Sequence, residues 1–518
     1  MIPFKAPVDD ILFCLHEVVG AERLSDWDSE IVGGILAHFA SFAEGVIAPL
    51  DEPGDAHGCR LEDGRVIMPT GFKEAFAQLA EGGWQGLTAP EELGGMAQNP
   101  LLAAAVSEIF SGANHAMQMV CNLVPGAIST LMKYGSTTQQ EYWVPRLASG
   151  ETLSTMCLTE ADAGSDLSRI RAKASHDGMT WQITGEKIFI SGGDQDLSND
   201  ILHLVLARTG SPEDGVKGLS LFLCASEIDG VRNAVTLTRI EEKLGLHASP
   251  TCQLAFHGAR AELIGTEGAG LQAMFTMMNH ARLDVALQGV AHAARAHQIA
   301  ASYAAERKQG RRTDGTEAVL ADHPDVQRML NEQLSLALGA RAMAFLTMAE
   351  LTLGERPALV NFLTPICKVF CTEAGIKAAD LGIQVLGGYG YLTEYRVSQT
   401  WRDARVTSIY EGANGIHAIT TATRGLRVIE CADAFAVLVE TLSGGNTACL
   451  DLLNDWQVAR SGMSDQAIEK AHDFMSLTAE LLFQAVWCKL AGTGDAEMIR
   501  LARTVARRPL PVRLPLVA

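Results

Sequence analysis

Apolar and polar positions follow different periods in successive parts of this chain. Up to about residue 150, apolar residues recur at three- and four-residue spacing, as in IVGGILAHFASFAEGVIAPL, which predicts amphipathic helices. Ser25 and Asp26 precede this stretch as candidate helix caps. The stretch LLAAAVSEIFSGANHAMQMV is apolar on nearly every face, which is typical of buried helices.

From about Thr152 to Leu263 the helical spacing gives way to short runs separated by turns. The segment RAKASHDGMTWQITGEKIFI alternates on both sides of Asp177-Gly178, a strong signal for a type I′ hairpin. The runs ILHLVLART, LSLFLCAS and TCQLAFHG follow at turn-separated intervals. We expect a compact, antiparallel, barrel-like β-domain here.

After about Gly268 the helical spacing returns, with three long helical patterns joined by short links that predict a bundle. A further helical stretch follows Ile429 and ends in RLARTVARRPLPVRLPLVA, a basic, proline-broken tail expected to be mobile. The pattern predicts an α+β multidomain fold rather than a doubly wound sheet. Its predicted parts are a helical domain at 1–151, a β-domain at 152–265, a helical bundle at 266–430, and a helical extension with the tail at 431–518.

Composition and charge narrow the function. The 518 residues carry a net charge of −20, which disfavours binding to a phosphate backbone and is ordinary for a soluble enzyme. The 11 cysteines are dispersed and no CxxC pair occurs, which predicts a reducing compartment and no zinc site. The N-terminal apolar stretch contains Asp9 and Asp10, and no uncharged apolar run reaches the length of a membrane span. We expect a cytoplasmic protein without membrane or nucleic-acid partners.

Several familiar nucleotide and hydrolase motifs are absent or incomplete. GAGLQA, from Gly268 to Ala273, matches a dinucleotide fingerprint, but more helix follows where a parallel strand is required. HEVVG at His16 lacks the second histidine of a zinc-protease motif. The sequence contains neither a GxxxxGK[ST] phosphate loop nor a GxSxG elbow.

Three other stretches combine residues that suit a polar or planar ligand. MCLTEADAGSDLS, Met156 to Ser168, leaves a strand for a loop of small residues and hydroxyls, which suits either ligand binding or a capped connection. EKIFISGG places Phe189 and Ser191 two residues apart on a strand, for stacking on a heterocycle or for core packing. In TSIYEGANGIHAI, Glu411 is either a solvated carboxylate at a helix start or a base aimed into a pocket.

Together and in this order, these stretches resemble the acyl-CoA dehydrogenase family over roughly residues 30 to 430. The resemblance implies an N-terminal helical domain, a central β-domain and a C-terminal four-helix bundle. It also implies bound FAD without a Rossmann domain, an acyl-CoA substrate, an electron-transfer flavoprotein as electron acceptor, and a homo-oligomer. The extension beyond the bundle favours a dimer over a tetramer.

The resemblance assigns Glu411 as the base that removes the α-proton while a hydride passes from the β-carbon to flavin N5. A carboxylate in a dry site has a raised pKa and accepts protons better near neutral pH. The oxyanion donors would be the main-chain N–H of Glu411 and a ribityl hydroxyl of FAD. The implied FAD contacts are Met156, Leu158, Thr159, Gly164, Ser165, Phe189, Ser191, Arg307, Gln384 and Gly388, with Arg307 reaching the neighbouring subunit's pyrophosphate. The implied substrate contacts are Ser165, Asn279, Arg282 and Gly412.

The chain departs from the family pattern at Ala413, Gly415 and the KQG that follows Arg307. FKAPVDDILFCLHEV, TAPEELGG and YEGANGI resemble the 3-methylmercaptopropionyl-CoA dehydrogenases of bacterial dimethylsulfoniopropionate breakdown. The expected reaction is therefore oxidation of that thioester to methylthioacryloyl-CoA. Three alternatives stay open: a short- or medium-chain acyl-CoA dehydrogenase of fatty-acid β-oxidation, an acyl-CoA oxidase, and a non-catalytic DNA-associated flavoprotein.

Overall fold

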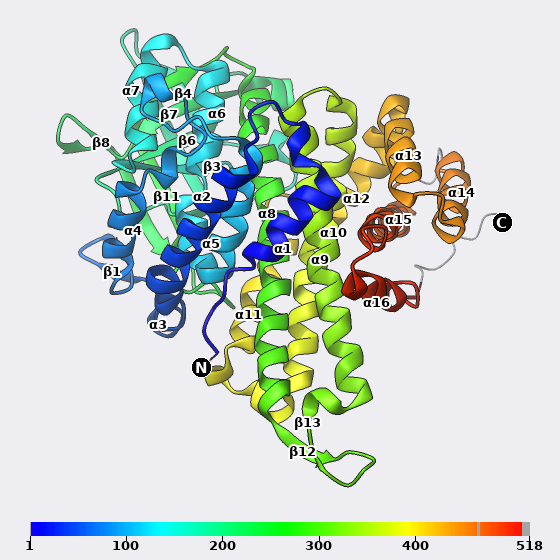
Figure 1. The fold of residues 1–518 in the computed structure, drawn as a ribbon. Helices are drawn as coiled ribbons and strands as arrows, with labels where there is room; N and C mark the ends of the chain where they lie inside the picture. Colours follow the sequence, from blue (N-terminus) through cyan, green and yellow to red (C-terminus); the bar gives the residue numbers. More distant parts are fainter. Residues whose placement is uncertain (1, 464–466, 510–518) are drawn as a thin grey trace. The chain divides into compact units, whose positions relative to one another are not determined.

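The computed structural model describes residues 2–463 and 467–509 (Figure 1). The chain divides into two compact units. Unit 1 comprises Met1–Gly45, Asn99–Ala113 and Arg282–Ala518, and unit 2 comprises Val46–Gln98 and Asn114–Ala281. The chain therefore passes between the units several times, and each unit is described by itself.

Unit 2 is built around a seven-stranded sheet in the order β10-β11-β5-β4-β6-β3, with β7 pairing with both β11 and β6. The pairs β11–β5, β5–β4, β4–β6, β6–β7 and β7–β11 close a ring, which confirms the predicted barrel-like domain. Phe222 and Phe256 are among its fully buried side chains. The strands are β3 (Thr152–Cys157), β4 (Lys173–His176), β5 (Trp181–Ser191), β6 (Asp200–Arg208), β7 (Leu219–Ala225), β10 (Val235–Ile240) and β11 (Thr251–Ile264).

Two details of the predicted β-domain are wrong. The sheet is mixed rather than antiparallel, because β3 pairs with β6 in parallel and β4 meets β6 in parallel at one residue pair. The hairpin at Asp177-Gly178 exists, but its last strand pair is His176 with Trp181, so four residues form the turn. Asp177 Oδ1 accepts the N–H groups of Met179 (2.9 Å) and Thr180 (2.8 Å), which replaces a two-residue I′ turn with an Asp-centred one.

Helices and short hairpins complete unit 2. Ser136 begins α7 with a capping box in which its hydroxyl and the Gln139 side chain satisfy each other's backbone N–H groups. The helices are α3 (Asp51–His57), α4 (Phe72–Glu81), α6 (Val124–Tyr134) and α7 (Thr137–Ala148), and the hairpins are β1 (Arg60–Glu62) with β2 (Arg65–Ile67) and β8 (Glu227–Ile228) with β9 (Val231–Arg232). Helix α5 (Pro100–Cys121) belongs to both units and is interrupted at Asn114, whose ψ is 92°.

Unit 1 is organised by three long helices, as the sequence predicted. They are α8 (Gly270–Glu306), whose first turns belong to unit 2, α9 (Pro324–Leu353) and α10 (Pro357–Leu386), and Figure 1 shows them side by side in green to yellow. A side chain at Gly289 would collide with the backbone carbonyl of Cys371, so α8 and α10 cross with almost no space between their backbones. The hairpin of β12 (Lys308–Arg311) and β13 (Glu317–Val319) links α8 to α9, and α11 (Val397–Arg405) and α12 (Asn414–Thr420) follow α10.

The N-terminal segment is part of unit 1. It forms α1 (Val8–Phe13), a π-helical turn (Cys14–Val19) that packs on α9, and α2 (Ser29–Phe42). The expected caps Ser25 and Asp26 are wrong, since Asp28 caps α2 by accepting the N–H groups of the two residues that follow Ser29.

The C-terminal extension also belongs to unit 1. Helix α15 packs on α9, α10 and α12, and Trp456 of α14 stacks on Phe474 of α15 and contacts Phe435 of α13. The predicted mobile tail is wrong at its start, because α16 continues to Val505 and packs on α9. Residues 510–518 lie outside the described residues. The helices are α13 (Ile429–Ser443), α14 (Thr447–Ser461), α15 (Ala471–Ala491) and α16 (Ala496–Val505).

Within residues 2–463 and 467–509, three helical stretches are long and apolar enough to cross a membrane by length and composition alone: Ser29–His57, Pro324–Leu353 and Pro357–Tyr391. The most apolar windows of the last two are 83% and 78% buried inside the protein, because α9 and α10 are core helices of unit 1. The window of the first is 39% buried. The expectation that the chain does not enter a membrane stays a prediction.

Candidate active site

Glu411 lies in a turn between α11 and α12 of unit 1, not inside a helix. Its φ is 54°, in the left-handed region, and Gly412 follows with a φ of 93°. Glycine adopts this conformation freely, whereas for a residue with a Cβ it costs roughly 1–2 kcal/mol. Strain of this kind at a carboxylate persists only where the surroundings hold it, and it is frequent at functional sites.

Side chains from three helices hold this turn by its carbonyl oxygens. Arg282 Nε of α8 donates to Glu411 O at 3.4 Å, and His417 Nε2 of α12 lies 3.1 Å from the same oxygen. Lys368 Nζ of α10 donates to Gly412 O at 2.9 Å. The turn is therefore fixed by donors that are up to 129 residues away in sequence.

The surroundings of Glu411 set its protonation. The residue as a whole is half-buried, and loss of solvent around its carboxyl raises the pKa of Glu411 to about 7. Arg282 and Lys368 act against this rise in pKa, while Asp284 adds to it. Burial lowers the pKa of His417 to about 3, so its imidazole is neutral and Nε2 donates its proton to Glu411 O. A carboxylate with a pKa near 7 can exist in either form at neutral pH, which suits proton transfer.

A chain of hydrogen bonds fixes the neighbouring tyrosine. Tyr410 Oη donates to Gln288 Oε1, and Gln288 Nε2 donates to Asp284 Oδ2 at 3.0 Å. Asp284 Oδ1 accepts from the Ser107 hydroxyl of α5. Burial raises the pKa of Tyr410 well above its ordinary value, so it remains a neutral donor.

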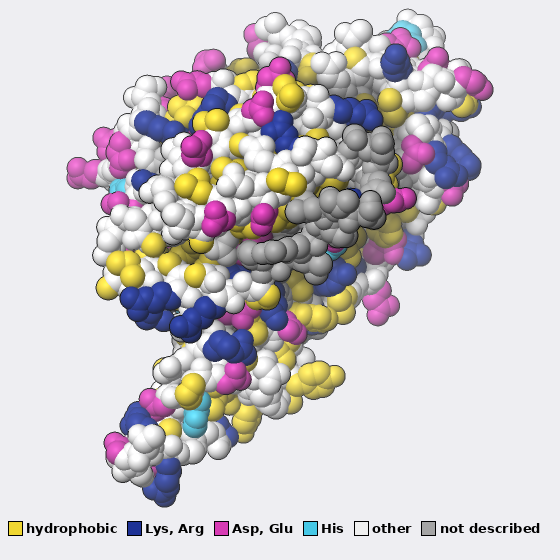
Figure 2. All heavy atoms as spheres, turned by 90° about the vertical axis from the view of Figure 1, so that its right-hand side faces the viewer, with side chains coloured by type: hydrophobic (Ala, Val, Ile, Leu, Met, Phe, Trp, Pro, Cys, Tyr) yellow, Lys and Arg dark blue, Asp and Glu magenta, His cyan; other side chains and the backbone are white. Residues whose placement is uncertain are grey.

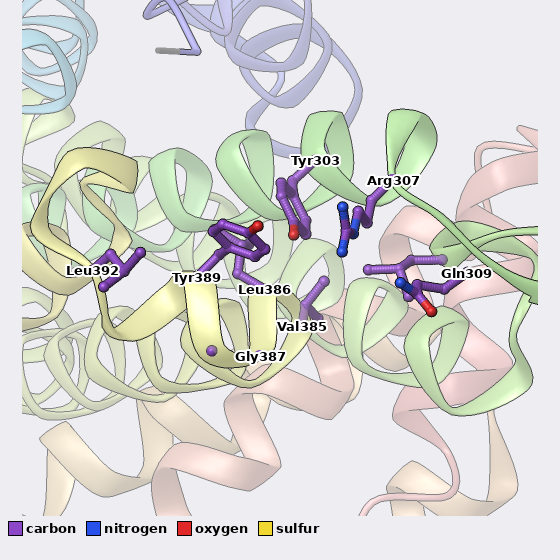
Figure 3. A pocket seen from close by; sticks show the side chains of 10 residues that line it. Tyr303, Arg307, Gln309, Val385, Leu386, Gly387, Tyr389 and Leu392 are labelled. Atoms are coloured by element: carbon purple, nitrogen blue, oxygen red, sulfur yellow. The ribbon is translucent and has the colours of Figure 1, made fainter.

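A pocket lies elsewhere in the same unit, where α8 and α10 terminate (Figure 3). This pocket has a volume of about 500 Å³ and includes Arg307 and Gly388, two of the predicted FAD contacts. Figure 3 shows Tyr303 extending from α8 and Arg307 from just beyond its last residue toward Tyr389, and the Arg307 guanidinium lies 5.4 Å from the Tyr389 ring centre. Gln384, the third contact predicted here, is exposed and is not among the lining residues.

In unit 2, the end of β3 and the loop that follows it carry five more predicted contacts. Met156 is half-buried on β3, Leu158 is buried, Thr159 is half-buried, and Gly164 and Ser165 are exposed. Buried Lys187 supports this loop, because its Nζ donates to Leu158 O and to Glu160 Oε1, both at 2.8 Å. The loop is thus a pre-formed surface of small and polar groups.

Phe189 and Ser191 lie on the accessible side of β5. The pairing of β5 with β11 shifts register at this point, and Phe189 adopts a φ of 58° there. As a result the Phe189 side chain is 60% exposed, while Ile190 between the two residues is buried. An exposed aromatic ring held by a bulge provides a platform for a planar ligand.

The remaining predicted contacts lie on α8 and in the Glu411 turn. Asn279 is exposed in the part of α8 that belongs to unit 2, and Arg282 is half-buried in unit 1. Gly412 adjoins Glu411, and a Cβ there would lie 2.8 Å from His417 Nε2, so only glycine fits.

Comparison with known proteins agrees with this arrangement. Three family models match: the acyl-CoA dehydrogenase N-terminal domain at residues 35–151, the middle domain at 155–259 and the C-terminal domain at 268–426. This chain belongs to the acyl-CoA dehydrogenase family. Its members are FAD-dependent flavoproteins that act on CH–CH groups, so FAD is the cofactor.

Individual relatives of this acyl-CoA dehydrogenase cover most of the chain. It is 41% identical to a 3-methylmercaptopropionyl-CoA dehydrogenase of Ruegeria pomeroyi, over 80% of this chain and 75% of the relative. It is 34% identical to a broad-specificity linear acyl-CoA dehydrogenase of Mycobacterium tuberculosis, over 81% and 74%. The fold of Caenorhabditis elegans ACDH-11, solved in complex with C11-CoA, superposes with a TM-score of 0.83 at 22% identity, covering 98% of this chain and 92% of that one.

The residues of this dehydrogenase fit the expected cofactor. Unit 2 offers the exposed Phe189 ring and the loop of small residues for a planar ring system, and the pocket of unit 1 offers the Arg307 cation for a phosphate. Sequence reasoning missed Lys368 and His417. The signal was present for Lys368, a single cation within the otherwise apolar run FLTPICKVFC of α10.

Proposed function

We propose that this acyl-CoA dehydrogenase oxidises 3-methylmercaptopropionyl-CoA to methylthioacryloyl-CoA, with Glu411 as the base that removes the α-proton. One observation carries the assignment of the base: the Glu411 carboxyl is desolvated on a strained, firmly held turn and has a pKa near 7. Solvated carboxylates at helix starts keep low pKa values, so the desolvation of the Glu411 carboxyl supports the base rather than the solvated carboxylate.

The chemistry requires a base that is deprotonated before reaction and protonated after it. The α C–H bond breaks, its proton moves to a carboxylate oxygen of Glu411, and a β C–H bond breaks with its electron pair. Bound FAD would supply the acceptor for that pair. Arg282 and Lys368 favour the deprotonated form that begins the reaction, whereas desolvation makes the carboxylate basic enough to take the proton.

The substrate assignment rests on the relative from Ruegeria pomeroyi, which is a 3-methylmercaptopropionyl-CoA dehydrogenase. The Mycobacterium tuberculosis relative acts on linear acyl-CoA thioesters, which keeps short and medium straight chains as the second candidates. An acyl-CoA oxidase would use the same base and reduce O₂, so peroxide release separates it from the dehydrogenase.

The proposal includes the cofactor contacts and partners expected from the family. The loop from Met156 to Ser165, together with Phe189 and Ser191, would hold the flavin ring, and Arg307 would reach the pyrophosphate of a neighbouring subunit. We further propose a cytoplasmic homo-oligomer, a dimer rather than a tetramer, that passes electrons to an electron-transfer flavoprotein.

A DNA-associated role has little support. The chain carries a net charge of −20, and on the face shown in Figure 2 acidic side chains accompany the basic ones over most of the surface, with one short row of basic side chains toward the lower left. Nucleic-acid binding surfaces need a concentration of positive charge, because the phosphate backbone dominates affinity.

The test is anaerobic mixing of the flavin-loaded protein with 3-methylmercaptopropionyl-CoA, butanoyl-CoA and octanoyl-CoA in separate experiments. Bleaching of the flavin establishes acyl-CoA dehydrogenation, and the first thioester should bleach it fastest. Fastest bleaching by octanoyl-CoA would contradict the substrate assignment. Bound FAD that no thioester bleaches would contradict the proposed activity itself.

Two matched variants test the base. Glu411→Gln should retain FAD and lose at least about 100-fold in bleaching rate, which is the usual contribution of a general base. Glu430→Gln, at an exposed position beyond the same segment, is the control and should bleach at the wild-type rate. A Glu411→Gln protein that bleaches as fast as this control would show that another group is the base.

A further inference from the structure

Lys368 is an unusual lysine, because its side chain is buried completely within α10. Its Nζ donates to Gly412 O at 2.9 Å and to Asn414 Oδ1 at 3.0 Å. Buried lysines are rare and need acceptors for their protons. Both acceptors of Lys368 lie within three residues of Glu411, so both of these hydrogen bonds go to the turn that contains Glu411.

Hydrogen bonds from α10 also orient the second acceptor. Asn414 Nδ2 donates to Thr372 Oγ1 at 3.3 Å and to Glu373 Oε1 at 3.1 Å. Because the amide nitrogen faces these oxygens, the amide oxygen must face Lys368. Asn414 is therefore held between Lys368 and residues one turn further along the same helix.

The backbone that Lys368 holds is the strained part of the site. Glu411 and Gly412 have φ values of 54° and 93°, and Lys368 fixes the second peptide while Arg282 and His417 fix the first. A hydrogen bond from a charged donor is stronger than one between neutral groups, so it can hold a non-glycine residue in this strained conformation. Lys368 thus offsets the strain from one side.

We propose that Lys368 is a positioning residue for Glu411. It clamps the Gly412 carbonyl and Asn414 so that the Glu411 turn keeps its left-handed conformation, and it keeps a positive charge beside the carboxylate that favours the proton-accepting form. The inference rests on the proposed role of Glu411 as the base. It adds a residue that the family resemblance and the sequence did not assign.

Titratable and charged groups from the neighbouring helices surround this carboxyl. Arg282 and Asp284 of α8 and Lys368 of α10 act on it directly, and Glu373 of α10 acts on Lys368. His417 of α12 is neutral and contacts the Glu411 carbonyl oxygen. Tyr410, which precedes Glu411 in sequence, stays neutral near pH 7 because burial raises its pKa. Arg282 and Lys368 are therefore the cations that favour the deprotonated base, and Asp284 opposes them.

The charges of Lys368 and Glu411 depend on each other. Burial lowers the pKa of Lys368 to about 7, whereas the Glu411 carboxylate raises it, so the ammonium and the carboxylate each favour the charged form of the other. Loss of the Lys368 charge should accordingly raise the pKa of Glu411 above its value of about 7. Since the base must be deprotonated, the acid limb of the rate profile should move to higher pH. Nearby opposite charges shift a carboxyl pKa by about 1 unit or more, so we expect a displacement of about 1 pH unit.

Four variants separate charge from packing. Lys368→Gln keeps a hydrogen-bond donor and removes the charge, Lys368→Met removes both, and Lys368→Arg keeps both. Lys377→Met, at an exposed position on the same helix, is the matched control. The measurement is the rate of anaerobic flavin reduction by saturating thioester as a function of pH, with bound FAD quantified for each protein.

The inference predicts an upward displacement of the acid limb in Lys368→Gln, return toward the wild-type position in Lys368→Arg, and no displacement in Lys377→Met. If Lys368→Met does not fold, the Gln and Arg variants carry the comparison. A Lys368→Gln profile that coincides with the wild type would overturn the inference. The inference also fails if the Gln and Arg profiles move together, because a purely structural role would affect both alike.

A second readout does not depend on turnover. The carboxyl band of Glu411 can be titrated by infrared difference spectroscopy, using Glu411→Gln to assign the band in the wild-type and Lys368→Gln backgrounds. An apparent pKa that rises in Lys368→Gln supports the inference, and an unchanged one refutes it. If no thioester bleaches the wild-type flavin, the proposed function fails while this titration still decides the role of Lys368.

Discussion

Replacing Lys187 with methionine should destabilise unit 2 and loosen the loop that we propose to bind the flavin. Lys187 is completely buried on β5, and its Nζ is bonded to Leu158 O and Glu160 Oε1. The substitution leaves a carboxylate whose side chain is 10% exposed without its counter-charge, and it leaves a buried carbonyl without its donor. Both losses fall on the segment between Met156 and Ser165.

The contacts of Glu160 determine how much unfolding free energy Lys187→Met should lose. Removing one partner of a buried ion pair costs about 3–5 kcal/mol, because the other charge is left uncompensated. Glu160 also accepts the backbone N–H groups of Arg171 at 2.7 Å and Ala172 at 3.1 Å, so it keeps two donors. We therefore expect Lys187→Met to lower the free energy of unfolding by about 2–4 kcal/mol.

The assay is urea unfolding followed by far-ultraviolet circular dichroism, with FAD affinity measured by flavin fluorescence. Lys173→Met, at an exposed position on neighbouring β4, is the control and should change stability by less than about 0.5 kcal/mol. Adding Glu160→Gln to Lys187→Met should recover part of the loss, since it removes the uncompensated charge. The reasoning is refuted if Lys187→Met costs less than about 1 kcal/mol, or if the double variant is no more stable than the single one.

Three further predictions concern unit 1. Glu411 has a folded pKa of about 7, above its ordinary 4.5, so the stability that its protonated form contributes below pH 4.5 is lost progressively as the pH rises from 4.5 through 7. Because Gln does not titrate, the unfolding free energy of Glu411→Gln should exceed that of the wild type increasingly over this range, by about 3 kcal/mol above pH 7. Glu108→Gln should cost about 3–5 kcal/mol in urea unfolding, because it leaves the fully buried Arg341 guanidinium without the carboxylate that contacts it at 2.7 Å. Gly339→Ala should cost about 1–3 kcal/mol by calorimetry, because its methyl group would collide with the Phe483 ring where α9 meets α15.

Periodicity predicted the helices and the barrel, because burial of one face leaves a direct trace in the sequence. The parallel pairing of β3 with β6 could not be predicted in this way. Alternation of apolar and polar residues indicates which face of a strand is buried, but not which strand lies beside it. The prediction of the helix cap was wrong for a related reason. Ser25, Asp26 and Asp28 can all cap a helix, and the path of the chain decides that Asp28 caps α2.

The residues of the candidate site likewise fall into those that the sequence indicated and those that it did not. Glu411, Phe189 and the loop after β3 could be proposed from the sequence because their local motifs are distinctive, and the fold brings Arg307 and Gly388 into one pocket. The sequence did not point to Lys368 and His417, because they contact backbone oxygens of the Glu411 turn, and such hydrogen bonds carry no side-chain signature in sequence. Long-range contacts of this kind appear only in three dimensions.

The most direct test of the central claim is the pH dependence of flavin reduction by 3-methylmercaptopropionyl-CoA, measured anaerobically between about pH 5 and 9 with substrate protonated or deuterated at the α-carbon. The account predicts a rate that rises with pH through an apparent pKa of about 7, with a primary isotope effect at the α-position. The rising limb should be absent in Glu411→Gln. A wild-type rate that stays constant across this range, or a limb that persists in Glu411→Gln, would contradict the assignment of Glu411 as the base.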